Sequence, residues 1–173
     1  MTNVEIGDIV LFPQGGIKSF VSYCLAWLLW LLVDIETKRK WARKHWHLGV
    51  VSNRSLTGLN IFEATAIGAC QNFYSWDKLK GFKIWHLPKA TTMDDMGRFI
   101  TDYNGKPYDV DNYFSVFWGS IRRFVFHKPY RVIDDENMCW ELARAWLDRN
   151  EASPVKDSVP LLITDLAKEA DGV

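Results

Sequence analysis

The chain has 173 residues, which fits one domain and is long enough to bury a hydrophobic core. Its 21 Lys and Arg residues balance 21 Asp and Glu residues, so the net charge gives no reason to expect a nucleic-acid partner. Nine tryptophans are many for this length, and they indicate broad aromatic surfaces in a cleft or at a membrane boundary.

The first residues, MTNVEIGDIVLF, lack the basic region, apolar core and small-residue cleavage site of a secretory signal. We therefore expect a mature chain that begins at Met1 and a cytoplasmic protein, with membrane association left open. The cysteines are Cys24, Cys70 and Cys139, an odd number without close spacing. This pattern does not resemble a disulfide framework, and it fits a reducing compartment.

The first third of the chain combines a short strand with a long apolar segment. Gly7 and Asp8 form a predicted turn that leads into a buried strand ended by Pro13. The apolar run within residues 19–33 is shorter than the roughly 20 residues of a membrane-spanning helix. It predicts either a buried core helix or a helix lying in a membrane interface, since the following segment from Lys38 to Lys44 is basic.

The middle of the chain predicts further strands. Residues 47–52 are β-branched and apolar, residues 53–58 are turn-rich, and residues 59–64 alternate like the second strand of a hairpin. Residues 82–87 alternate again and stop at Pro88. The pattern favours an antiparallel sheet.

Three helical segments and a short last element follow. Thr91 or Thr92 is expected to cap a helix that carries apolar residues at helical spacing and ends at residues 104–107. Residues 113–126 are aromatic and helix-like, and residues 134–137 open a helix with one apolar face: Cys139, Leu142, Ala143 and Trp146. Residues 161–167 form a final short element. We predict one α+β domain over residues 1–173, with helices packed on the sheet.

Cys139 lies at the beginning of the last of these helices, with Asn137 or Asp135 as the predicted cap. The N–H groups and the dipole of a helix N-terminus favour a thiolate, the reactive form of cysteine. Asp134, Asp135 and Glu136 oppose this effect, so a cation or a hydrogen-bond donor is needed beside the sulfur. Without such a partner, Cys139 would be a small buried core residue.

His47 can be this partner, because it begins a strand whose hairpin neighbour carries a single acidic residue, Glu63. A carboxylate beside a histidine fixes its tautomer and ring direction. Each of these residues has a plain structural alternative, a packed or exposed histidine and a solvent-facing carboxylate. Together with Cys139 they supply the nucleophile, base and orienting group of covalent acyl chemistry.

The order of these motifs resembles the circularly permuted NlpC-type, papain-like cysteine hydrolases, in which the histidine strand precedes the cysteine helix. The matching segments are Gly7-Asp8-Ile9-Val10, His47-Leu48-Gly49-Val50-Val51, Ile61-Phe62-Glu63-Ala64, Tyr108-Asp109 and Cys139-Trp140-Glu141-Leu142. The resemblance implies a permuted papain-like fold without a cofactor. It also implies that Cys139 is the nucleophile, His47 the general base and Glu63 the residue that orients His47.

Two features depart from the resembled family. Trp140 follows the cysteine where a small polar residue is common, which would narrow the pocket. Residues 19–46 form a long aromatic and basic insertion before the histidine strand. The backbone N–H of Cys139 is the expected first donor to the oxyanion, and Tyr108 or Tyr23 is a candidate for the second.

His45 and His47 would point to the same face of an extended strand, as a pair of zinc ligands does. Candidates for the remaining ligands are Cys70, Cys139, His86 and Glu63, but none has a recognisable zinc spacing. We therefore favour the hydrolase interpretation of His47 and expect no metal. His86 and His127 are interpreted as structural or surface residues.

The sequence thus predicts a cysteine hydrolase of the amidase or peptidase type that cleaves an amide or ester bond. Its expected substrates are a peptide, a peptidoglycan fragment or an acylated lipid. The apolar run from Phe20 to Val33 and the basic segment after it leave two alternatives open. One is a lipid acyltransferase or lipase-like enzyme of the same fold, and the other is a non-catalytic protein of the membrane surface.

Overall fold

The structure is a computed structural model that describes residues 3–13, 45–65, 67–107, 139–152 and 166. For residues 45, 46 and 140 it describes the backbone only. In these parts of the chain the elements are β1 (Ile9–Pro13), β2 (His45–Arg54), β3 (Gly58–Thr65), β4 (Gly68–Ser75), β5 (Lys83–Trp85), α3 (Met93–Tyr103) and α5 (Cys139–Arg149).

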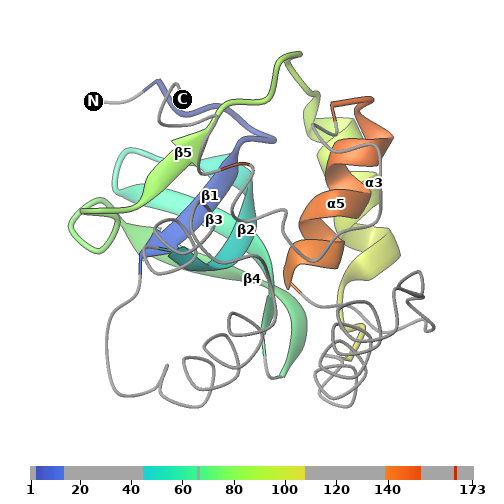
Figure 1. Cartoon of the computed structure of the whole chain (residues 1–173), viewed down its shortest axis with the longest axis horizontal. Helices are drawn as coiled ribbons and strands as arrows, with labels where there is room; N and C mark the ends of the chain where they lie inside the picture. Colours follow the sequence, from blue (N-terminus) through green and yellow to red (C-terminus); the bar gives the residue numbers. More distant parts are fainter. Residues whose placement is uncertain (1–2, 14–44, 66, 108–138, 153–165, 167–173) are drawn as a thin grey trace, which may run out of the picture.

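The five strands form one antiparallel sheet in the order β4-β3-β2-β1-β5 (Figure 1). The strands β2, β3 and β4 follow one another as two hairpins, and β1 lies between β2 and β5. In the first hairpin, Ser55 tightens the turn, because its Oγ donates to the carbonyl oxygen of Gly58 at 3.1 Å and accepts from the N–H of Gly58 at 3.1 Å. The fold is therefore α+β.

Side chains on alternating positions of the strands enter two separate cores. Leu48 and Val50 pack with α3 and α5 in the larger core, whereas Val51 and Ile61 belong to the smaller one. The two helices lie beside each other on one side of the sheet (Figure 1). Between them, the rings of Phe99 and Trp146 have their centroids 4.9 Å apart.

Helix α3 begins as its sequence predicts, and the apolar faces of both helices are buried. Thr92 caps α3, because its Oγ1 accepts from the backbone N–H of Asp95 at 3.1 Å. Met96 and Phe99 face the core, and Met93 at the helix start is exposed. The apolar face of α5 is buried as predicted and comprises Cys139, Leu142, Ala143 and Trp146.

The Gly7-Asp8 turn connects the sheet to α5. Gly7 has a φ of +96°, which favours glycine, and a Cβ there would lie 2.7 Å from Cγ2 of Thr91. The indole Nε1 of Trp146 donates to the carbonyl oxygen of Gly7 at 2.8 Å. The buried Asp8 accepts from the backbone N–H groups of Glu5 and Leu87, both at 2.9 Å. Asp8 therefore connects the segment before β1 with the segment after β5.

Most predicted elements are confirmed where the structure describes them. The strand before Pro13, the hairpin and the helix capped at Thr92 are present; β2 is longer than predicted and β5 shorter. The strand β4 was not predicted, although it directly follows the hairpin.

Several sequence predictions lie outside the described residues. These are the apolar segment 19–33, the basic segment 38–44, the helix-like segment 113–126, the capping residues of α5, and all of the last element except Leu166, which is helical and buried. Within the described part of the chain, no helix has the length and apolar character needed to cross a membrane.

Candidate catalytic site

His47 is a buried residue of β2. It lies opposite Phe12 of β1 in the sheet, and the centroids of the two rings are 4.9 Å apart. Only 7% of His47 is exposed. Its neighbours Leu48 and Val50 point into the larger core, so His47 and Gly49 occupy the alternate positions of the strand. The strand thus holds the imidazole against Phe12 and fixes its position.

Glu63 of β3 is the acidic partner of this histidine. Its Oε2 lies 2.6 Å from Nε2 of His47, and the carboxylate residue is only 2% exposed. A Cβ at position 49 would lie 2.4 Å from Cγ2 of Ile61 and 3.3 Å from Cβ of Glu63. Gly49 therefore leaves the space that these two β3 side chains occupy. This close approach is a physical reason for a glycine two residues after the histidine.

The second oxygen of Glu63 is held by two side chains of β4. The hydroxyl of Tyr74 donates to Oε1 at 2.6 Å, and Nδ2 of Asn72 donates to the same oxygen at 2.9 Å. Burial alone would raise the pKa of Glu63. The hydrogen bond with His47, its charge and the two donors from β4 outweigh this effect, so the pKa of Glu63 is lowered overall. The carboxylate is thus kept ionised although it is buried.

His47 is held in its protonated form by two partners. Burial alone would lower its pKa. The charge of the Cys139 sulfur and a side-chain hydrogen bond with it, followed by the hydrogen bond and charge of Glu63, raise the pKa of His47 to about 10. Glu63 engages Nε2, and the imidazole has the Cys139 sulfur as its other named partner. The arrangement is that of an imidazolium between a sulfur and a carboxylate.

Cys139 is the first residue of α5. Its thiol is free of any disulfide, and the residue is 6% exposed at the border of the larger core. The first N–H groups of an α-helix have no partner within the helix. The structure therefore brings Cys139, His47 and Glu63 together from α5, β2 and β3.

The other residues predicted for the site are not placed. Tyr108 and Tyr23 lie outside the described residues, and so does the side chain of Trp140, whose backbone belongs to α5. The insertion at residues 19–46 is described only at its last two residues, which begin β2. The site as described therefore consists of the three predicted residues and the partners of Glu63.

Asn72 and Tyr74 were missed because β4 was not predicted. The signal was present in the sequence: after Gly68, the residues Cys70, Asn72 and Tyr74 alternate with others, as residues on one face of a strand do. Their polar character concealed the strand, since a strand is recognised mainly by apolar residues on its buried face.

The remaining sequence predictions concern the other histidines and the zinc alternative. Nδ1 of His86 lies 2.9 Å from Oδ2 of Asp8 and the His86 side chain is 56% exposed, which agrees with the prediction of a structural or surface residue. His127 and the side chain of His45 lie outside the described residues. No group of three or more potential metal ligands occurs among the residues that the structure describes.

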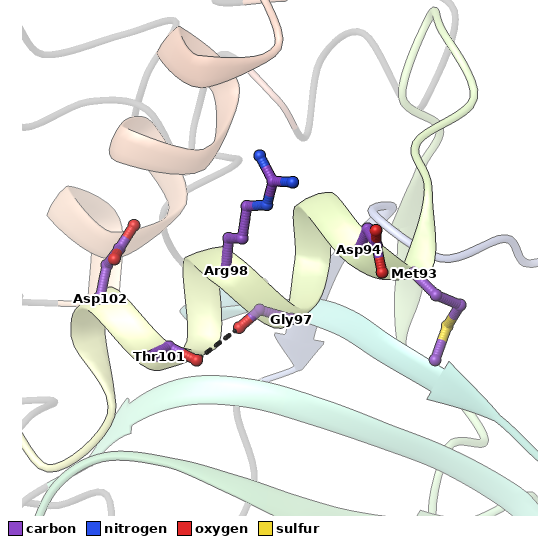
Figure 2. Close-up of a pocket in the computed structure, with 6 residues that line it drawn as sticks. All are labelled: Met93, Asp94, Gly97, Arg98, Thr101 and Asp102. Atoms are coloured by element: carbon purple, nitrogen blue, oxygen red, sulfur yellow. Dashed lines mark hydrogen bonds between the residues drawn. The ribbon is translucent and has the colours of Figure 1, made fainter.

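A surface pocket of about 430 Å³ lies along α3, away from the triad residues. Figure 2 shows its lining side chains, all from this one helix: Met93, Asp94, Gly97, Arg98, Thr101 and Asp102. The hydroxyl of Thr101 donates to the carbonyl oxygen of Gly97 at 2.9 Å, within the helix itself. The pocket is open and contains no nucleophile paired with a base, so it is a poorer candidate for catalysis than the triad.

No protein-family model matches the chain, and comparison with curated proteins finds no match either. The class of site is therefore defined by its geometry. A cysteine at a helix start, an imidazole and a buried carboxylate form a Cys-His-Glu constellation on an α+β fold.

Proposed function

We propose that the chain is a cysteine hydrolase that cleaves an amide or ester bond through a thiol acyl-enzyme. Cys139 is the nucleophile, His47 the general acid and base, and Glu63 the residue that orients His47. The observation that carries this proposal is that the His47 imidazole lies 2.6 Å from Oε2 of Glu63 through Nε2 and also interacts with the Cys139 sulfur.

The proposed reaction begins with the thiolate of Cys139 and the imidazolium of His47. The sulfur attacks the substrate carbonyl carbon, and the backbone N–H of Cys139 donates to the resulting oxyanion. As the carbon–nitrogen or carbon–oxygen bond breaks, the imidazolium gives its proton to the leaving amine or alcohol. A thioester on Cys139 and a neutral His47 remain.

Water then completes the cycle. Neutral His47 takes a proton from a water molecule, whose oxygen attacks the thioester carbonyl. The carbon–sulfur bond breaks, the carboxylic acid product leaves, and the thiolate–imidazolium pair is restored. Glu63 neither gains nor loses a proton in either step, and it acts by holding the imidazole of His47 in place. Tyr108 and Tyr23 stay candidates for the second oxyanion donor.

The proposed fold is papain-like and circularly permuted. Two observations support it: the histidine strand β2 precedes the cysteine helix α5 in the chain, and the acidic residue comes from the strand paired with β2. The short strand β1 after the Gly7-Asp8 turn completes the sheet beside β2. The same sequence of motifs led to the family resemblance.

Formation of the acyl-enzyme tests the proposal. The purified protein is mixed with a p-nitrophenyl ester, and we expect a burst of nitrophenolate equal to the enzyme concentration, with an acyl group on the Cys139 peptide in mass spectrometry. Cys139→Ser should remove the burst and the label while the circular dichroism spectrum stays unchanged. Cys70→Ser is the matched control, because Cys70 is the second free cysteine described and a serine hydroxyl can still accept from Nδ2 of Asn72, so this variant should retain both signals.

Substrate class is tested on the same acyl-enzyme. Peptide amides, peptidoglycan fragments and phospholipids are offered in turn, with water or an added amine or alcohol as acceptor. Release of free acid defines a hydrolase, and transfer to the added acceptor defines an acyltransferase. A protein that shows no labelling of Cys139 with any acyl donor, yet binds anionic vesicles at low salt, would be a membrane-surface protein instead.

A further inference from the structure

We propose that Tyr74 and Asn72 are positioning residues, which lock the Glu63 carboxylate in one orientation so that its other oxygen stays on His47. This inference rests on the proposed function and names two residues beyond the triad. Their direct partner is Glu63, and they act on the chemistry only through the orientation and charge of His47.

The geometry divides the carboxylate into two halves. Oε2 faces the imidazole at 2.6 Å, whereas Oε1 accepts from Tyr74 at 2.6 Å and Asn72 at 2.9 Å. Rotation of the carboxylate would break all three bonds at once. The single orientation that satisfies every partner is therefore strongly preferred over any other.

The register of the β3–β4 hairpin explains why both donors reach the same oxygen. Glu63 lies opposite Cys70, and Asn72 and Tyr74 follow Cys70 at intervals of two, so their side chains share its face of the strand. The amide nitrogen of Asn72 uses its two hydrogens on Oε1 of Glu63 and, at 3.5 Å, on Sγ of Cys70. This double use fixes the direction of the amide.

Aromatic packing fixes Tyr74 in turn. The Tyr74 ring meets Phe12 edge-on at a centroid distance of 5.4 Å, and it lies 6.1 Å from Phe82. Phe12 also packs against His47. The Phe12 ring therefore contacts both Tyr74 and His47, the two residues that Glu63 connects by hydrogen bonds. Burial, and then Glu63, raise the pKa of the Tyr74 hydroxyl, so it stays a donor over the whole pH range in which enzymes work.

The donors also favour the ionised carboxylate. A carboxylate that accepts several hydrogen bonds holds its charge to lower pH than one that accepts fewer. Removing a donor should therefore make Glu63 easier to protonate, and protonated Glu63 no longer supports the imidazolium. The acid limb of the pH–activity profile should report this loss.

The test compares Tyr74→Phe and Asn72→Ala with the wild type. Each variant should lower kcat for the p-nitrophenyl ester with little change in KM, and move the acid limb of kcat upward by about one pH unit. Tyr103→Phe is the matched control, because it removes the same hydroxyl from a ring that packs on Phe99 and Lys106, far along the chain from Glu63. It should leave the profile unchanged.

A second readout needs no substrate. In NMR spectra of protein labelled at histidine nitrogen, the Nε2–H proton of His47 should exchange faster with water in Tyr74→Phe than in the wild type. Glu63→Gln and His47→Ala identify this resonance. If Tyr74→Phe does not fold, Asn72→Ala carries the same comparison.

The two proposals fail in distinguishable ways. If Cys139 is never acylated but the Nε2–H of His47 exchanges faster in the variants, the enzyme proposal is wrong and the positioning role holds. If the acyl-enzyme forms, and both folded variants keep the wild-type pH profile and exchange rate, Tyr74 and Asn72 are only structural. That outcome overturns the inference.

Discussion

Replacing Glu63 by Gln separates the charge of this side chain from its shape. The amide oxygen of glutamine can still accept from Nε2 of His47, where the carboxylate oxygen now lies at 2.6 Å. The amide nitrogen would then face Tyr74 and Asn72, which both donate to Glu63 in the structure. The hydroxyl of Tyr74 can rotate to accept, and the amide of Asn72 can turn over, so the fold should survive.

The size of the effect follows from the loss of charge. A hydrogen bond to a charged group contributes about 1.5–3 kcal/mol, compared with about 1 kcal/mol between neutral groups, so the substitution should cost about 0.5–2 kcal/mol. One pKa unit corresponds to about 1.4 kcal/mol, so the pKa of His47 should fall by about one unit. In the wild type this pKa is raised to about 10, mainly by the Cys139 sulfur and then by Glu63 against the effect of burial.

The sign of the pH dependence follows from the two pKa shifts. The pKa of His47 is raised from 6.5, so its stabilisation is complete below about pH 6.5 and is lost as pH rises toward 10. The pKa of Glu63 is lowered from 4.5, so its stabilisation is complete above about pH 4.5 and is lost as pH falls. The wild type should therefore exceed Glu63→Gln in stability most clearly at about pH 5–6.

Two measurements check this reasoning. Urea unfolding of both proteins at a series of pH values gives the difference in free energy of unfolding, and NMR titration of labelled histidines gives the pKa of His47. We expect the difference to shrink steadily above about pH 6.5. A constant difference across this range, together with an unchanged His47 titration, would refute the imidazolium–carboxylate pair.

Three further substitutions test the site and its support. His47→Ala should slow alkylation of Cys139 by iodoacetamide near neutral pH by about 10- to 100-fold and leave Cys70 unaffected, as measured by peptide mass spectrometry; equal slowing of both cysteines contradicts the pairing. Gly49→Ala should destabilise the fold by about 1–3 kcal/mol in urea unfolding, because its Cβ would lie 2.4 Å from Cγ2 of Ile61. Trp146→Phe should cost about 2–4 kcal/mol, since it deletes buried ring atoms and the bond to Gly7, and an unchanged urea midpoint would show that this bond is unimportant.

The sequence predicted the elements correctly where the apolar periodicity agrees with the turn and capping residues at the element ends. The hairpin of β2 and β3 has alternating apolar residues on both sides of a turn-rich segment, and α3 has a capping threonine before residues at helical spacing. The pairing of His47 with Glu63 could be predicted, because neighbouring strands of one hairpin bring their side chains together. The proximity of Cys139 was predicted only through the family resemblance, since no local rule connects a helix start to a strand about 90 residues earlier.

The partners of Glu63 show what a single sequence conceals. Asn72 and Tyr74 are polar or half-buried, and their strand contributes little to either core. Their importance arises only when β4 pairs with β3 and the alternating face turns toward Glu63. Long-range pairing, rather than local propensity, therefore decides which polar residues enter the site.

The register of the first hairpin explains how Glu63 comes to face His47. Near the turn, Asn53 lies opposite Asn60, but beyond it Val51 lies opposite Ile61, so Ser52 is an extra residue in β2. Continuing the pairing from Asn53 without this bulge would place Glu63 opposite Val50, on the face that packs against α3 and α5.

With the bulge, the same strand places Glu63 opposite Gly49, on the face shared with His47. Ser52 is held in this irregular position by two hydrogen bonds: its Oγ donates to the carbonyl oxygen of Asn60 at 3.0 Å and accepts from Nε2 of Gln71 at 2.8 Å. A one-residue irregularity, fixed by neighbouring polar groups, thus determines that the carboxylate meets an imidazole instead of the apolar core. Gly49 and the bulge at Ser52 therefore act together: Gly49 leaves the space that Glu63 occupies, and the bulge places Glu63 on the same face of the sheet as His47.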